Sequence, residues 1–165
     1  MKTSQSRDLV LFGVAAAVLV LDQLTKSWVR TALRPGVPWN PMPFLRPVLS
    51  FTYVTNTGAS FGLFPQLAHV YALIAVAVSL GIVYFRTQLP YASFLVWVSL
   101  GMQLGGSLGN LVDRLLHQGR VTDFIDLNFW PLQEWPVFNI ADSSVVVGVV
   151  VLAIYMLREG PDIPS

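Results

Sequence analysis

The chain has 165 residues, of which 54% are hydrophobic and only 12% charged, and its mean hydropathy is +0.60. Because soluble domains have about 25% charged residues, this composition indicates a membrane protein. A net charge of +1 with scattered basic residues argues against a nucleic-acid-binding surface, and the lack of cysteine excludes disulfides, thiol nucleophiles and iron–sulfur clusters.

Four apolar runs are long enough, or nearly so, to cross the hydrocarbon core of a bilayer, which needs about 20 helical residues. They are residues 9–28, 67–85, 91–112 and 137–157. We predict transmembrane helices over about 9–28, 67–85, 91–117 and 137–157. The first run follows a basic start, as in a signal peptide, but no small-residue cleavage site follows it, so it is predicted to be an uncleaved helix. No internal repeat is evident, and one integral membrane domain over residues 1–165 is expected.

The two longer connections differ in composition from the helices. Within residues 31–66, prolines give way to VLSFTYVTN, a β-branched and aromatic run that predicts a strand ending at a turn with Gly58. Within residues 118–136, the segment 121–129 can also be extended, and Trp130 and Trp135 follow it. Tryptophan at such places favours the membrane–water interface. We therefore predict an all-α membrane bundle of four transmembrane helices, with a small β platform and a second loop at one membrane face.

The basic residues do not determine which way the bundle faces. Four crossings place both termini on one side, together with the tight RTQLP connection. The basic residues expected on that side are Lys2, Arg7, Arg86 and Arg158. The larger group, Lys26, Arg30, Arg34, Arg46, Arg114 and Arg120, falls at the other ends and loops. The positive-inside rule therefore leaves the orientation undecided.

The third apolar run has glycine at every fourth position, at Gly101, Gly105 and Gly109. A phosphate-binding loop is conceivable, but this spacing within an apolar helix is better explained by close packing against a neighbouring helix. We therefore expect these glycines to be structural.

Polar residues from four separate segments gather at the membrane face beneath the predicted platform. They are Asn56 in the first connection, Asn110, Asp113 and Arg114 at the end of the third helix, Asp123 and Asp126 in the second loop, and Asn139 and Asp142 at the start of the fourth helix. A carboxylate at the edge of the hydrocarbon is costly and is usually retained for function. Two aspartates held close in a water-poor site share a proton, so that one can activate a water while the other protonates a carbonyl oxygen. The pattern predicts aspartic protease chemistry.

Two other classes of function remain open at this point. A metal-dependent membrane hydrolase could use Asp113, His117, Asp123 and Asp126 as ligands. A non-enzymatic transporter or scaffold could use the buried polar residues to pass an ion or to fix the bundle. Four short crossings without discontinuous helices argue against the transporter hypothesis. Activity that persists in excess chelator would exclude the hypothesis of a metal-dependent hydrolase.

Some of these residues also have a structural interpretation. Asp22 and Lys26 stand one helical turn apart, which predicts an ion pair at the end of the first helix. Asp113 and Arg114 could form a structural bridge at the end of the third helix. Asp126 is expected to be a solvated loop residue.

Five short sequence motifs occur in order along nearly the whole chain. They are LDQLTK, TNTGASFG, GGSLGNLVDR, VTDFID and FNIADS. Their order and placement on one face resemble the lipoprotein signal peptidases, also called signal peptidase II. Ser107 and Thr122 stand where that family more often has alanine and valine, and we expect these departures to touch no polar role.

The resemblance implies an aspartic endopeptidase of the bacterial plasma membrane. Such an enzyme removes the signal peptide from prolipoproteins, on the amino side of a diacylglyceryl-modified cysteine. The implied partners are this substrate and membrane lipids, with no cofactor, metal, nucleic acid or obligate protein partner expected. The resemblance also implies that both termini are cytoplasmic and that the platform and the second loop are extracytoplasmic, with the active site at the outer face.

The resemblance further assigns roles to individual residues. The family's catalytic pair falls on Asp123 and Asp142. Site-lining positions of the family match Asn56, Asn110, Arg114 and Asn139, and motif positions with structural or orienting roles match Asp22, Lys26, Gly58 and Asp113. Because Asp142 begins the fourth predicted helix, near the positive end of its dipole, we expect it to be the more readily charged of the pair.

Overall fold

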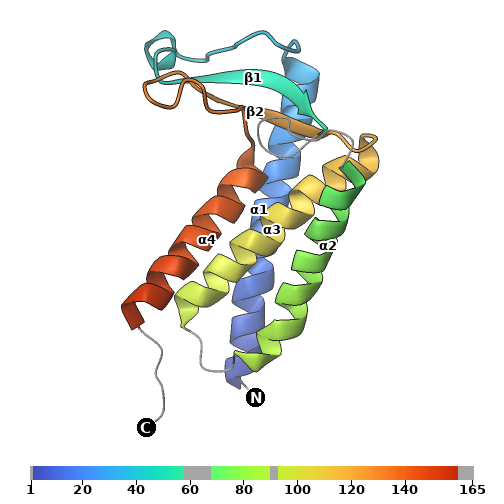
Figure 1. The fold of residues 1–165 in the computed structure, drawn as a ribbon, viewed down its shortest axis with the longest axis vertical. Coiled ribbons are helices and arrows are strands. Elements are labelled where there is room, and N and C mark those ends of the chain that lie inside the picture. The colour runs from blue at the N-terminus through green and yellow to red at the C-terminus, as the bar shows by residue number, and fades with distance from the viewer. Residues whose placement is uncertain (1, 58–67, 90–92, 160–165) are drawn as a thin grey trace.

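The computed structural model describes residues 2–57, 68–89 and 93–159, and in it four long helices carry a two-stranded sheet at one end (Figure 1). The helices are α1 (Lys2–Ala32), α2 (Ala68–Phe85), α3 (Phe94–Leu116) and α4 (Ile140–Glu159). All four are long and apolar enough to cross a membrane. Helix α1 begins and α4 ends at the end of the bundle opposite the sheet. The predicted bundle of four apolar helices is confirmed.

The helix ends depart from the apolar runs for local reasons. Helix α1 extends beyond residues 9–28 at both ends, and in the extension after residue 28 Arg30 pairs with the buried Asp113 of α3. Helix α4 begins only at Ile140, because the side chain of Asn139 caps its first turn. The predicted starts of the second and third helices, at residues 67 and 91, lie outside the described residues.

Helix α3 is the central helix and packs against the other three. Half of its most apolar stretch is buried, against 17% or less in each of the other helices. Its glycines make this packing possible: a Cβ atom on Gly105 would lie 2.6 Å from the backbone oxygen of Ala15 in α1. A Cβ atom on Gly106 would collide with the backbone oxygen of Ala141 in α4. The prediction of close helix packing at the α3 glycines is confirmed.

The sheet pairs β1 (Leu49–Asn56) with β2 (Val121–Leu127) in antiparallel fashion. Both predicted extended segments are therefore strands. The register pairs Leu49 with Leu127 at one end and Asn56 with Val121 at the other. Single bridges from Trp39 to β1 and from Phe138 to β2 widen the sheet at its two edges.

A bulge in β1 decides which side chains face the helices. Thr52 and Tyr53 together stand opposite Phe124, so β1 has one extra residue between Phe51 and Val54. Side chains alternate between the two faces of a strand, and an extra residue reverses this alternation for everything that follows it. The bulge therefore brings Asn56 onto the face of the sheet that carries Asp123.

Candidate active site

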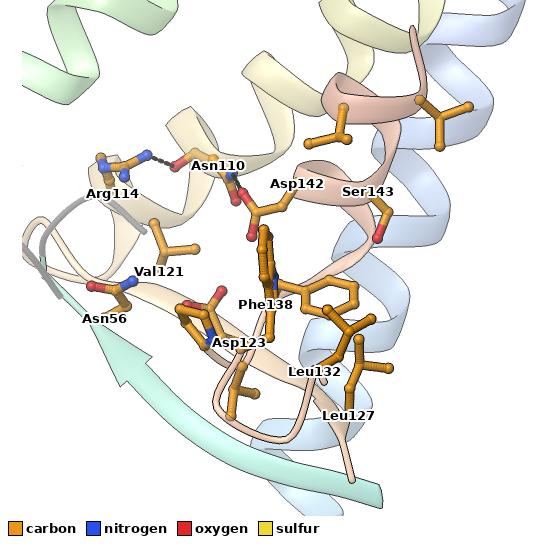
Figure 2. A pocket seen from close by; sticks show the side chains of 15 residues that line it. Asn56, Asn110, Arg114, Val121, Asp123, Leu127, Leu132, Phe138, Asp142 and Ser143 are labelled. Carbon is orange, nitrogen blue, oxygen red and sulfur yellow. Dashed lines mark hydrogen bonds between the residues drawn. The ribbon is translucent and has the colours of Figure 1, made fainter. Parts of the chain in front are cut away.

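A cavity of about 410 Å³ lies where the sheet meets the ends of α3 and α4 nearest to it (Figure 2). Its polar lining consists of Asn56, Asn110, Arg114, Asp123, Asp142 and Ser143. Its apolar walls come from β2, the segment after β2 and α4, and include Leu127, Trp135, Phe138, Val146 and Val147. The cavity gathers both aspartates of the predicted catalytic pair and three of the four predicted site-lining residues.

Asn139, the fourth predicted site-lining residue, connects the two aspartates. Its side-chain Nδ2 donates to Oδ1 of Asp123 at 2.6 Å. Its backbone N–H donates to Oδ2 of Asp142 at 3.2 Å, and its Oδ1 accepts from the backbone N–H of Asp142 at 2.9 Å. Asn139 is completely buried, so these contacts are shielded from solvent. One residue therefore holds both carboxylates, Asp123 through its side chain and Asp142 through its backbone N–H, and both point toward the same space in Figure 2.

Asn110 of α3 provides the second contact to Asp142. Its Nδ2 donates to Oδ1 of Asp142 at 2.7 Å. Its Oδ1 accepts from Nδ2 of Asn139 at 3.1 Å and from Nζ of Lys26 at 2.9 Å. Both oxygens of Asp142 thus receive N–H donors, and its place in the first turn of α4 adds the favourable end of the helix dipole.

The electrostatic environment of Asp123 differs from that of an ordinary surface aspartate. Asp123 lies in β2 with 3% of its surface exposed. Burial, reinforced by the negative charge of Asp142, raises the pKa of Asp123 from 3.8 to about 7. Side-chain hydrogen bonds from Asn139 and Asn56 and the charge of Lys26 oppose this rise. Near neutral pH the pair can therefore hold a single proton, as an acid and a base working together require.

Arg114 places a positive charge at the wall of the cavity. Its guanidinium group lies 5.7 Å from the ring centre of Tyr71 in α2, and its Nη1 donates to the backbone oxygen of Asn110 at 3.4 Å (Figure 2). Arg114 and the neighbouring Asp113, considered above as a possible bridge, face different groups. Successive helical residues point about 100° apart, and Asp113 turns toward α1 while Arg114 turns toward the cavity.

Asp22, Lys26, Arg30 and Asp113 form a buried charged cluster next to the cavity, which we call the α1–α3 cluster. Nζ of Lys26 lies 2.8 Å from Oδ2 of Asp22 and 3.6 Å from Oδ2 of Asp113, and Nη1 of Arg30 lies 3.3 Å from Oδ1 of Asp113. Asp22, Lys26 and Asp113 are fully buried. The predicted Asp22–Lys26 ion pair is confirmed, but it is part of a larger network and lies well before the end of α1.

The α1–α3 cluster also contacts the backbone around the two aspartates. Oδ1 of Asp22 accepts from the backbone N–H of Ala141 at 2.9 Å, and Oδ2 of Asp113 accepts from the backbone N–H of Thr122 at 2.8 Å. Nη1 of Arg30 donates to Oγ1 of Thr122 at 3.0 Å. The expectation that Thr122 has no polar role is therefore wrong, because valine there would leave Arg30 without this acceptor.

Other predicted residues lie away from the cavity. Asp126 belongs to β2 and accepts a hydrogen bond from Oγ1 of Thr52 at 2.6 Å, so it is not a solvated loop residue. Nδ1 of His117 lies 3.9 Å from Oδ1 of Asp113. The metal-ligand set of the alternative hypothesis is not gathered: within residues 2–57, 68–89 and 93–159 no three His, Asp or Glu side chains form such a group. Gly58, expected to be structural or orienting, lies outside the described residues.

Arg30 is the functional-site neighbour that the sequence interpretation missed. The signal was present, because Asp22, Lys26 and Arg30 recur at every fourth residue in the second half of α1. This spacing places all three on one face. Three charges on one face of a membrane helix indicate a buried partner on another helix, which here is Asp113.

Comparison with known proteins identifies the family. The family model described as signal peptidase (SPase) II matches residues 14–158. A lipoprotein signal peptidase of Desulfitobacterium hafniense (strain DSM 10664 / DCB-2) is 42% identical over 142 residues, covering 86% of this chain and 89% of that protein. Lipoprotein signal peptidase of Moorella thermoacetica is 40% identical over 144 residues, covering 87% and 90%. The chain belongs to the signal peptidase II family.

Solved structures agree with the family assignment. Two structures, each described as a bacterial membrane enzyme, match this fold with TM-scores of 0.82 and 0.78. The first structure is 29% identical, and the match covers 94% of this chain and 92% of the matched chain. The second is 30% identical, and the match covers 91% of this chain and 94% of the matched chain. As a member of the signal peptidase II family, the protein is a membrane-bound aspartic peptidase. Neither a metal-dependent hydrolase nor a non-enzymatic transporter or scaffold fits this family.

Proposed function

We propose that this peptidase removes the signal peptide from prolipoproteins on the amino side of a diacylglyceryl-modified cysteine, with Asp123 and Asp142 as its catalytic pair. The observation that carries the proposal is the double contact of Asn139, which fixes both carboxylates at one cavity. The names of the relatives, lipoprotein signal peptidases, support the substrate class.

The two carboxylates suit complementary roles in hydrolysis. Asp142, which receives two N–H donors, acts as the base that takes a proton from water while the water oxygen attacks the scissile carbonyl carbon. Asp123, whose pKa is raised to about 7, gives its proton to the carbonyl oxygen. When the tetrahedral intermediate collapses, the carbonyl re-forms and that proton returns to Asp123. The proton held by Asp142 goes to the leaving nitrogen as the C–N bond breaks.

The neighbouring polar residues hold this arrangement. Asn139 and Asn110 orient Asp142, while Asn139 and Asn56 hydrogen-bond Asp123. Arg114 lines the cavity and can contact polar groups of the substrate near the scissile bond.

The shape of the cavity supports a substrate that arrives within the bilayer. Val146 and Val147 of α4 line the cavity, yet 59% and 46% of their surfaces remain exposed on the outside of the bundle. The cavity wall is therefore continuous with a helix surface that faces lipid in a membrane. Acyl chains can stay in the hydrocarbon while the peptide bond reaches the polar end of the cavity, where water can enter.

The proposed location is the bacterial plasma membrane, with both termini cytoplasmic and the cavity at the outer face. Trp28 and Trp39 pack edge to face at the end of α1 beside the sheet, with ring centres 5.5 Å apart. Aromatic side chains of this kind favour the membrane–water interface. They support a boundary between lipid and water near the level of the cavity.

Cleavage of a synthetic prolipoprotein with and without its diacylglyceryl group tests the proposal. The purified enzyme is expected to cleave the lipidated form between the signal peptide and the cysteine, and to cleave the unlipidated form much more slowly. Equal rates on both forms would contradict the lipid-substrate proposal. The same assay in excess chelator is expected to give an unchanged rate, since no chemical step is assigned to a metal.

A further inference from the structure

The α1–α3 cluster lies next to the proposed catalytic pair and contacts the backbone beside each of the two aspartates. Each of its two carboxylates accepts the backbone N–H of the residue that precedes one of the proposed catalytic aspartates. Asp22 accepts the N–H of Ala141, the residue before Asp142, and Asp113 accepts the N–H of Thr122, the residue before Asp123. The distance between the two catalytic segments therefore depends on the distance between Asp22 and Asp113.

Lys26 is the cation that spans these two carboxylates, and the neutral Gln23 amide also donates to both, at 3.1 Å to Asp22 and 3.4 Å to Asp113. The ammonium nitrogen of Lys26 lies 2.8 Å from Asp22 and 3.6 Å from Asp113. Two carboxylates that approach each other without a cation between them repel strongly in a buried site. Lys26 thus holds together the two acids that anchor the backbone before each catalytic aspartate.

Lys26 also fixes the direction of the amide that faces Asp142. An ammonium group only donates hydrogen bonds, so the atom of Asn110 at 2.9 Å from Nζ must be its oxygen. The amide nitrogen of Asn110 is then directed at Asp142, 2.7 Å away. Without Lys26, the Asn110 oxygen keeps the longer hydrogen bond from Nδ2 of Asn139, at 3.1 Å, but loses its charged donor, so the amide is held less firmly against Asp142.

We propose that Lys26 is a positioning residue for the proposed catalytic pair: it spans Asp22 and Asp113 and directs the Asn110 amide at Asp142. This inference rests on the proposed function. It gives Lys26 a role in the rate and pH dependence of hydrolysis beyond stability of the bundle, although its side chain does not line the cavity.

The pH dependence of hydrolysis reports this role. The charged groups that act on Asp123 are Lys26 from α1, Arg114 from α3 and Asp142 from α4. Because the positive charge of Lys26 lowers the pKa of Asp123, removal of that charge raises this pKa further. Asp123 then keeps its proton to higher pH, and the pH at which the rate falls on the alkaline side moves upward.

Kinetics of Lys26→Met and Lys26→Arg test the proposal, with cleavage of the lipidated precursor as the assay. For Lys26→Met we expect kcat to fall on the order of 10²-fold per folded molecule, as for other small misplacements of reacting groups, with KM nearly unchanged. The alkaline limb of its pH–rate profile, where the rate falls as pH rises, should move to higher pH. Lys26→Arg keeps a charged donor and is expected to recover part of the lost kcat and the original alkaline limb.

A double variant keeps the test decisive if Lys26→Met folds poorly. Asp22→Asn combined with Lys26→Met restores the charge balance of the cluster, so its thermal stability should exceed that of Lys26→Met. Its kcat should remain low, because the charged donor to the Asn110 amide oxygen is still missing. Asp8→Asn, which breaks the partly exposed Asp8–Arg86 ion pair far from the cavity, is the control and should match the wild type.

The possible failures can be told apart. If Asp123→Asn or Asp142→Asn retains activity, the proposed catalytic pair is wrong and the role of Lys26 falls with it. If both are inactive but folded Lys26→Met has the wild-type kcat and alkaline limb, only the positioning role is overturned. The same holds if the double variant recovers kcat together with stability, because Lys26 would then serve stability alone.

Discussion

Asn139 and Asp142 cap each other across the first turn of α4. The side chain of Asn139 accepts the N–H of Asp142, and the side chain of Asp142 accepts the N–H of Asn139. This reciprocal arrangement satisfies two backbone donors at the start of a helix, as a capping box does. The proposed catalytic base is therefore also part of the structure that begins α4, and a substitution at Asp142 affects chemistry and folding by separate routes.

Asp142→Asn and Asp142→Ala separate these two routes. Both remove the carboxylate, so single-turnover cleavage should fall on the order of 10² to 10⁴-fold in each. Asparagine retains an oxygen that can accept the N–H of Asn139, whereas alanine loses this half of the reciprocal cap, which costs about 1 kcal/mol of folding stability. Thermal unfolding should rank the wild type above Asp142→Asn and Asp142→Ala last. Near-normal turnover in either variant would refute the proposed base.

Asp123→Asn should show the same loss of turnover, because the proton donor is gone while the shape is kept. The double variant Asp123→Asn with Asp142→Asn should be scarcely slower than either single variant, since the two groups act as one unit. Asp126→Asn is the matched control: Asp126 bonds Thr52 and lies outside the cavity, so substantial activity is expected. An inactive but stable Asp126→Asn would show that the wrong β2 aspartate had been chosen.

The raised pKa of Asp123 predicts a pH dependence of both rate and stability. Asp123 must carry a proton for hydrolysis, so the rate should fall as pH rises through about 7. The folded pKa lies above the unfolded value of 3.8, so this group's stabilising contribution is complete below that value and is lost as pH rises through about 7. Thermal unfolding in detergent between about pH 5 and pH 8 should therefore show a decline that Asp123→Asn lacks. Parallel pH curves for the two proteins would contradict this assignment.

Close packing at the α3 glycines predicts a large effect from a single methyl group. Gly105→Ala places a Cβ atom 2.6 Å from the backbone oxygen of Ala15, which cannot move without shifting α1. Such overpacking typically costs about 1–3 kcal/mol, and we expect stability and activity to fall together. Gly81→Ala in α2 is the control, because no atom lies within 4 Å of its new Cβ and stability should not decrease. Gly105→Leu with unchanged thermal stability would disprove the packing interpretation.

The proposed orientation can be measured directly, because the chain has no cysteine of its own. Thr31 and Gln133 lie near the sheet, Gln88 lies at the opposite end of the bundle, and all three are exposed. Single cysteines at Thr31 and Gln133 should react with an impermeant reagent added to intact cells. A cysteine at Gln88 should react only after the cells are opened. The reverse pattern of labelling would invert the proposed topology.

The helices and both strands could be predicted from the sequence, because apolar run length and β-branched composition are local properties. The sharing of one sheet face by Asn56 and Asp123 could not be predicted in the same way. Simple alternation along 49–56 places Asn56 on the face opposite Phe51, whereas the extra residue at Thr52 and Tyr53 returns it to that face. A bulge depends on pairing with a distant strand and leaves little trace in the sequence.

The site was predictable as a set of residues but not as a set of contacts. Motif resemblance identified Asp22, Lys26 and Asp113, and helical spacing predicted the Asp22–Lys26 pair. Their hydrogen bonds to Ala141 and Thr122 join positions 119 and 9 residues apart, respectively. Such contacts depend on how α1, α3 and α4 pack, which composition does not determine. The polar role of Thr122 was missed for this reason.

The bond between Asp22 and Ala141 has a consequence for the biogenesis of the enzyme. A nascent chain enters the membrane from its N-terminus, so α1 and its charges are present long before α4 emerges from the ribosome. Asp113 joins those charges when α3 arrives, whereas the N–H of Ala141 reaches Asp22 only when the C-terminal helix docks. Asp142 travels with that helix. The proposed catalytic pair is therefore not assembled until α4 is inserted, and a chain that terminates before α4 is expected to be an inactive membrane fragment.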